Sequence, residues 1–152
     1  MDYNWNDIFA QAERFNRASD LLNQKDDLNI VSFTNAAFAI ELYYKAIYLK
    51  TTGEDPRKAN HDIIKIFESL SQEVQVEIKN DYDSEQKKRN NLSEVEKYYK
   101  SILPDFSKDF IWNLRQVKSA FLNFRYVYEK GKTASIVFYS ELRISIVKQL
   151  QK

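Results

Sequence analysis

The sequence predicts an all-α protein, an up-and-down bundle of four or five main helices with additional short helices. The chain of 152 residues holds only two glycines and two prolines, whereas a sheet protein of this size needs many tight turns built from those residues. Apolar residues also recur at helical spacing in every long segment. The length suits a single domain, residues 1–152, which can bury a core without covalent cross-links.

Two long helices are predicted in the first third of the chain. Residues 3–24 have one apolar face and one charged face. Residues 28–52 follow a short polar break, and their centre, "AAFAIELYYKAIYL", is apolar almost all round, which is typical of a helix contacted on most sides. Gly53 is a natural C-cap for this helix, with Pro56 just beyond it.

The middle of the chain predicts shorter elements. A third helix is expected in "NHDIIKIFESL", residues 60–70, with Asn60 as N-cap. A short helical piece follows over 71–82. The very polar stretch 81–92 is either a loop or the solvated start of a helix. Ser93 and Glu96 then fit a capping box that opens a helix to about residue 103, with Val95, Tyr99, Ile102 and Leu103 facing inward.

The last third of the chain predicts two more helices. A long helix is expected over residues 106–130, after the break at Pro104, with an aromatic and aliphatic stripe at helical spacing. "EKGK" at 129–132 separates it from a final helix over 134–150. No internal repeat or low-complexity segment is present.

The composition excludes several function classes. The formal net charge is +1, so no global field favours nucleic acid or a membrane, and any such binding needs a local patch. The absence of cysteine excludes disulfides, thiolate metal sites and a cysteine nucleophile. There is no HExxH motif and no pair of histidines, so neither a metal site nor a cofactor is expected. No signal peptide and no apolar run of about 20 residues is present, which favours a cytoplasmic protein without a membrane span.

Three charged residues, Glu41, Lys45 and Arg125, lie on apolar helical faces. An unpaired buried charge is costly, so each should have a partner. We expect Glu41 and Arg125 to form an ion pair with Lys45 nearby. This pair either fixes the register of two central helices or positions a polar site; in the second case the polar cluster comprises Glu41, Lys45, His61, Asp62 and Arg125.

His61 is the only histidine and has two interpretations. It can satisfy local backbone groups at a helix start, or it can act as a catalytic base. The first is favoured because one histidine without a second imidazole, a cysteine or an obvious serine partner is a weak catalytic signal.

Two compact basic stretches are the candidates for nucleic-acid contact. "PRKAN" supplies Arg57 and Lys58, and "QKKRNN" supplies Lys87, Lys88 and Arg89. Such residues neutralise phosphates in RNA complexes, although a charge run is more often a solvated face.

The segment 36–70 resembles the first half of a HEPN (higher eukaryotes and prokaryotes nucleotide-binding) domain. It carries the pattern A-x-E-L-x-x-K-A, a Gly/Pro loop and an H-D helix start. "FLNFRYVYEKG", residues 121–131, is similar to the Arg-Tyr segment late in such domains. The resemblance implies an all-α bundle that is usually dimeric. It also implies kinship with metal-independent ribonucleases of defence and toxin–antitoxin systems, whose signature is an Arg followed, after four to six residues, by a His.

The chain departs from that nuclease signature. The eligible positions after Arg125 hold Lys130, Gly131 and Lys132 rather than a histidine. The leading interpretation is therefore a non-catalytic module that binds RNA, a nucleotide or a partner protein, as a homodimer or with that partner. One alternative is a metal-independent ribonuclease with a variant site, for which the candidates are His61, Arg125, Tyr126 and Glu129. The other is a purely protein-interacting helical domain.

Overall fold

The computed structural model describes residues 2–125 and 136–152, with the side chains of 121–125 left out. In these ranges the chain forms helices and no strand, which confirms the all-α prediction. The α-helices are α1 (Trp5–Leu22), α2 (Asn29–Thr52), α3 (Ile63–Ser69), α4 (Gln72–Lys87), α5 (Leu92–Ile102), α6 (Phe110–Arg125) and α7 (Tyr139–Leu150). Two short 3₁₀ helices, η1 (Asp26–Leu28) and η2 (Pro56–Ala59), precede α2 and α3.

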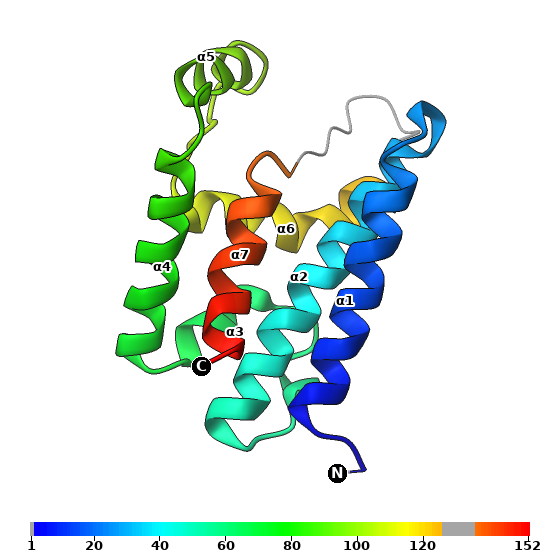
Figure 1. Cartoon of the computed structure of the whole chain (residues 1–152), viewed down its shortest axis with the longest axis vertical. Coiled ribbons are helices and arrows are strands. Elements are labelled where there is room, and N and C mark those ends of the chain that lie inside the picture. Colours follow the sequence, from blue (N-terminus) through cyan, green and yellow to red (C-terminus); the bar gives the residue numbers. More distant parts are fainter. Residues whose placement is uncertain (1, 126–135) are drawn as a thin grey trace.

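Helices α4, α7, α2 and α1 lie side by side in one layer (Figure 1). The two central helices, α7 and α2, run parallel, and the two outer helices, α4 and α1, run in the opposite direction. Helix α6 crosses behind this layer and packs on α2, α3, α4 and α7. The short α3 lies near the end of the layer that also holds the C-terminus (Figure 1).

Helix α2 is the centre of the protein, as its apolar sequence predicts. It contacts α1, α3, α6 and α7, and Ile40, Tyr43, Tyr44 and Ala46 are completely buried. Helix α2 begins directly after η1, so the predicted polar break between α1 and α2 consists of a short turn and this 3₁₀ helix. Burial on most sides explains why this helix has little amphipathic character.

Helix α4 corrects two predictions for the polar middle of the chain. The piece expected over 71–82 continues as one helix to Lys87, so most of the stretch 81–92 is neither a loop nor the start of a new helix. Its buried residues, Ile78, Tyr82 and Gln86, are four apart and share one face. The polar residues between them face outward, which is why composition alone suggested a loop.

Helix α5 lies beyond the ends of α4 and α7 (Figure 1) and has no fully buried residue. Val95, Tyr99 and Leu103 pack against the core as predicted, but Ile102 is 53% exposed, so its predicted inward position is wrong. The helix begins at Leu92, one residue before Ser93, and the predicted capping box does not form.

The boundaries of the last two helices also differ from the prediction. Helix α6 begins at Phe110 rather than 106, and Asn113 stabilises the preceding turn by donating to the carbonyls of Ser107 and Asp109. Helix α7 begins at Tyr139 rather than 134. The segment 126–135, which includes the predicted break at 129–132, lies outside the described residues.

Candidate functional site

The buried carboxylate of Glu41 is the centre of the candidate site. Glu41 lies in the middle of α2 and is only 3% exposed. The ammonium of Lys45, one turn later, donates to its Oε1 at 2.6 Å. Nδ1 of His61 lies 2.9 Å from the same oxygen. Three of the five predicted cluster residues therefore meet at one atom, and His61 reaches it from a different element.

The loop between α2 and α3 positions His61. Gly53 ends α2 in the left-handed conformation, with φ of 69°. Asp55 accepts a hydrogen bond from the backbone of Arg57 and so starts η2 at Pro56. Asn60, with φ of 53°, then reverses the chain back toward α2. These turns bring His61 against a helix that ended nine residues earlier.

Asp62, the residue after His61, connects the start of α3 to α6. Its Oδ1 accepts from the backbone N–H of Lys65 at 3.2 Å, so Asp62 is the N-cap of α3 and the predicted cap, Asn60, is wrong. Its Oδ2 accepts from Lys118 of α6 at 2.8 Å. This hydrogen bond is the main reason that the pKa of Asp62 is lowered from its usual value. The site thus joins α2, α3 and α6.

The predicted Glu41–Arg125 ion pair lies outside the described residues, because the side chain of Arg125 is not described. Tyr126 and Glu129, the other two variant-nuclease candidates, lie in the undescribed segment. Within the part of the chain that is described, Glu41 Oε2 is buried and has no hydrogen-bond partner.

The first basic stretch adjoins this site. Arg57 forms an ion pair with Asp55, with Nη2 2.5 Å from Oδ2, and its guanidinium packs over the ring of Tyr3. Lys58, the next residue, is exposed. The charge of Arg57 is therefore largely balanced by Asp55, and the exposed Lys58 is the candidate cation of this loop.

The second basic stretch lies at the far end of α4, where α5 follows, whereas η2 lies at the opposite end of the layer (Figure 1). Lys88 pairs with Glu85 at 2.7 Å. Arg89 donates from both Nε and Nη2 to Glu141 of α7, and its guanidinium lies over the ring of Phe138. Lys87 is exposed. The fold thus separates the two stretches and pairs Arg89 with the buried carboxylate of Glu141.

Glu141 is a buried ionisable residue that the sequence analysis missed. It is 4% exposed and anchors α7 to the end of α4 through Arg89. A signal was present, because Glu141 lies three residues after Phe138 and four before Ser145, both fully buried, and this spacing places all three on one helical face.

A second network joins α1, α2 and α7. Tyr43 donates to Glu13, and Arg143 donates to both Tyr43 and Glu13. Burial is the main cause that raises the pKa of Tyr43 above its usual value. This network ties three helices together and lies away from His61.

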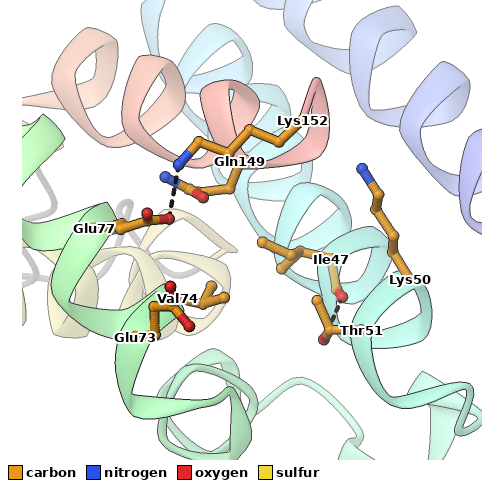
Figure 2. Close-up of a pocket in the computed structure, with 8 residues that line it drawn as sticks. All are labelled: Ile47, Lys50, Thr51, Glu73, Val74, Glu77, Gln149 and Lys152. Atoms are coloured by element: carbon orange, nitrogen blue, oxygen red, sulfur yellow. Dashed lines mark hydrogen bonds and ion pairs between the residues drawn. The ribbon is translucent and has the colours of Figure 1, made fainter.

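A hollow of about 340 Å³ lies between α2, α4 and the end of α7 (Figure 2). Its lining residues are Ile47, Lys50, Thr51, Glu73, Val74, Glu77, Gln149 and Lys152. Lys152 pairs with Glu77 at 2.7 Å, and Lys50 donates to the carbonyl of Leu150 and packs on the ring of Trp5. Both cations are therefore held by the protein itself, and none of the predicted site residues lines the hollow.

The described part of the chain shows neither a membrane-spanning helix nor a cluster of metal ligands. Among residues 2–125 and 136–152, no helix has the length and apolar character needed to cross a bilayer. In those ranges, no three acidic, histidine or cysteine side chains gather in a way that would hold a metal ion.

Comparison with known proteins gives a match to a family model. The family model described as the HEPN domain matches residues 5–132. This range contains Glu41, Lys45, His61, Asp62 and Lys118. Neither the curated proteins nor the solved structures gave a match.

Proposed function

This chain belongs to the HEPN domain family, and on that premise we propose that it is a non-catalytic helical module that binds RNA. One observation carries the proposal. The only histidine of the chain is anchored on a buried carboxylate, and its side chain is 75% exposed. A histidine that served only to compensate Glu41 would have no need of this exposure.

The cations around His61 suit a phosphate backbone. Lys118 of α6 lies on Asp62, the residue after His61, and its side chain is 45% exposed. Lys65 is exposed on α3, and Arg115 is exposed one turn before Lys118 on α6. Local lysine and arginine side chains supply the sequence-independent part of RNA affinity, which a net charge of +1 does not.

The same residues argue against ordinary ribonuclease chemistry. Cleavage by attack of the ribose 2′-hydroxyl needs a group that removes a proton and a group that returns one to the leaving oxygen. Histidine is the side chain best suited to both tasks at neutral pH, and this chain has one. We therefore assign His61 to binding.

The proposal includes a homodimer or a complex with a partner protein in the cytoplasm, as part of a defence or toxin–antitoxin type system. Membership of the family supports this setting. Exposed apolar side chains at the junction of α1 and α2 support an interface: Leu21 is 66% exposed, Ile30 42% and Val31 48%. Light scattering tests the oligomer, and a monomer mass at high concentration contradicts the homodimer.

RNA binding is tested by fluorescence anisotropy with a labelled single-stranded RNA over a range of salt concentrations. Lys65→Glu and Arg115→Glu should each weaken binding and reduce the magnitude of the salt slope by about one. Lys25→Glu makes the same charge change at the opposite end of the layer and should have little effect. Equal losses in all three variants would show that the His61 face is not the binding surface.

A metal-independent ribonuclease with a variant site is the second candidate. The Glu41–His61 contact favours it, because a carboxylate that orients an imidazole is a recurrent way to position a general base. Incubation of mixed RNA with the protein in chelator tests it, beside His61→Ala and Arg125→Ala. Cleavage that is lost in both variants would replace the non-catalytic proposal, whereas binding without cleavage supports it.

A further inference from the structure

We infer that the guanidinium of Arg57 is a phosphate site held closed by Asp55, and that a phosphate of single-stranded RNA binds there by displacing this carboxylate. The inference rests on the proposed RNA binding and adds to it a site with a built-in inhibitor. The loop between α2 and α3 carries both residues, and His61 follows Arg57 by four positions on the same loop. The site therefore extends the proposed binding surface.

Asp55 occupies the part of Arg57 that would bind a phosphate. Nε of Arg57 lies 2.9 Å from Oδ2 and 3.0 Å from Oδ1 of Asp55, and Nη2 lies 2.5 Å from Oδ2. A guanidinium uses the same forked geometry for a carboxylate and for a phosphate. The hydrogen bond from Arg57 is the main cause that lowers the pKa of Asp55 below its usual value, so this carboxylate is ionised at neutral pH. It therefore competes with a phosphate for Arg57 and repels it.

The guanidinium is exposed and is oriented by an aromatic ring. The Arg57 side chain is 72% exposed, whereas that of Asp55 is 20% exposed. The guanidinium carbon lies 5.5 Å from the centroid of the Tyr3 ring, within the range of a cation–π contact. Tyr3 directly precedes Asn4, the N-cap of α1, and its hydroxyl donates to Asp55 Oδ1 at 2.9 Å. The ring therefore supports Arg57 at the surface when the carboxylate releases it.

The fold of the loop does not depend on the negative charge of Asp55. Its Oδ1 accepts from the backbone N–H of Arg57 at 2.9 Å and so caps η2. An uncharged asparagine or serine fills such a capping position equally well. Exposed ion pairs add little to the free energy of unfolding. The charge of Asp55 therefore acts mainly on what binds to Arg57 and to the exposed Lys58 beside it.

Asp55→Asn tests the inference, because it removes the charge and keeps both the cap of η2 and an acceptor for Tyr3. Fluorescence anisotropy with a labelled single-stranded RNA gives the affinity and its dependence on salt concentration. We expect the affinity to rise by roughly three- to tenfold and the salt slope to increase in magnitude by about 0.7, as for one more phosphate contact on a single strand. Asp55→Ser removes the same charge, retains a capping side chain and should show the same gain.

Two further variants separate the release of Arg57 from the change in net charge. Asp55→Asn/Arg57→Gln should lose the gain, because the guanidinium that binds the phosphate is absent. Glu54→Gln removes the adjacent exposed charge and keeps an acceptor for the hydroxyl of Tyr48, so its gain should stay below about twofold. No gain in Asp55→Asn and Asp55→Ser, an equal gain in Glu54→Gln, or a gain that survives in the double variant overturns this inference alone. Failure of the natural protein and of every variant to bind RNA overturns the proposed function and this inference with it.

Discussion

Replacement of Lys45 by methionine tests the energetics of the buried carboxylate. The side chains of Glu41 and Lys45 are 4% and 15% exposed, so both charges are largely removed from water. Breaking a buried ion pair by removing one partner costs about 3–5 kcal/mol, because the other charge stays buried and unpaired. His61 still donates to Glu41 in this variant, so we expect the lower end, about 3 kcal/mol. A chain of this length loses about 2–4 °C in melting temperature per kcal/mol, which gives a fall of about 6–12 °C.

The assay is urea unfolding followed by far-ultraviolet circular dichroism. Glu41→Leu/Lys45→Met removes both charges and should lie within about 1 kcal/mol of the natural protein. Lys100→Met is the matched control, because Lys100 and Glu96 form the same i,i+4 pair on α5 but are 56% and 25% exposed. Its cost should be about 0.5 kcal/mol or less. The reasoning fails if Lys45→Met costs no more than Lys100→Met, or if the double variant is as unstable as the single one.

Three further changes probe other parts of the fold. Gly53→Ala should lower the free energy of unfolding by about 1 kcal/mol through the left-handed backbone alone, since a Cβ there meets nothing within 4 Å. Gly53→Asn should lower it less in the same urea assay, because asparagine tolerates this conformation better than alanine. Equal losses in the two variants would contradict a backbone cause. Tyr82→Phe should cost about 1–2 kcal/mol by removing the hydroxyl that donates to the carbonyl of Lys108, and an unchanged urea midpoint would refute it. The pKa of Asp62 is lower in the folded protein than its value of about 3.8 in the unfolded chain. The ionised carboxylate therefore stabilises the fold at pH values above about 3.8, and this stabilisation is lost as the pH falls through the pKa of the folded protein. Lys118→Met removes the main cause of the lowered pKa, so the urea midpoints at about pH 7 and about pH 3 should differ less than in the natural protein. An unchanged difference would show that Lys118 does not lower the pKa of Asp62.

The sequence predicted the helices whose signals are local. The apolar centre of α2 and its glycine cap placed that helix to within a residue. Glu41 and Lys45 were predicted to lie together because residues four apart on a helix are neighbours whatever the rest of the chain does. The length of α4 was missed because its outward face is so polar that three buried residues at helical spacing were not weighed against it.

The contacts that make the candidate site depend on how the helices pack. His61 reaches Glu41 across 20 residues, Lys118 reaches Asp62 across 56, and Arg89 reaches Glu141 across 52. No spacing rule links such residues, because the distance between two helices is set by the whole core. The sequence by itself determined an all-α chain with charges that needed partners. Only the tertiary structure decided that His61 joins Lys45 on the carboxylate of Glu41. Helical spacing does not link His61 to Glu41; the chain reversal at Asn60 does, because it brings the loop back onto the central helix.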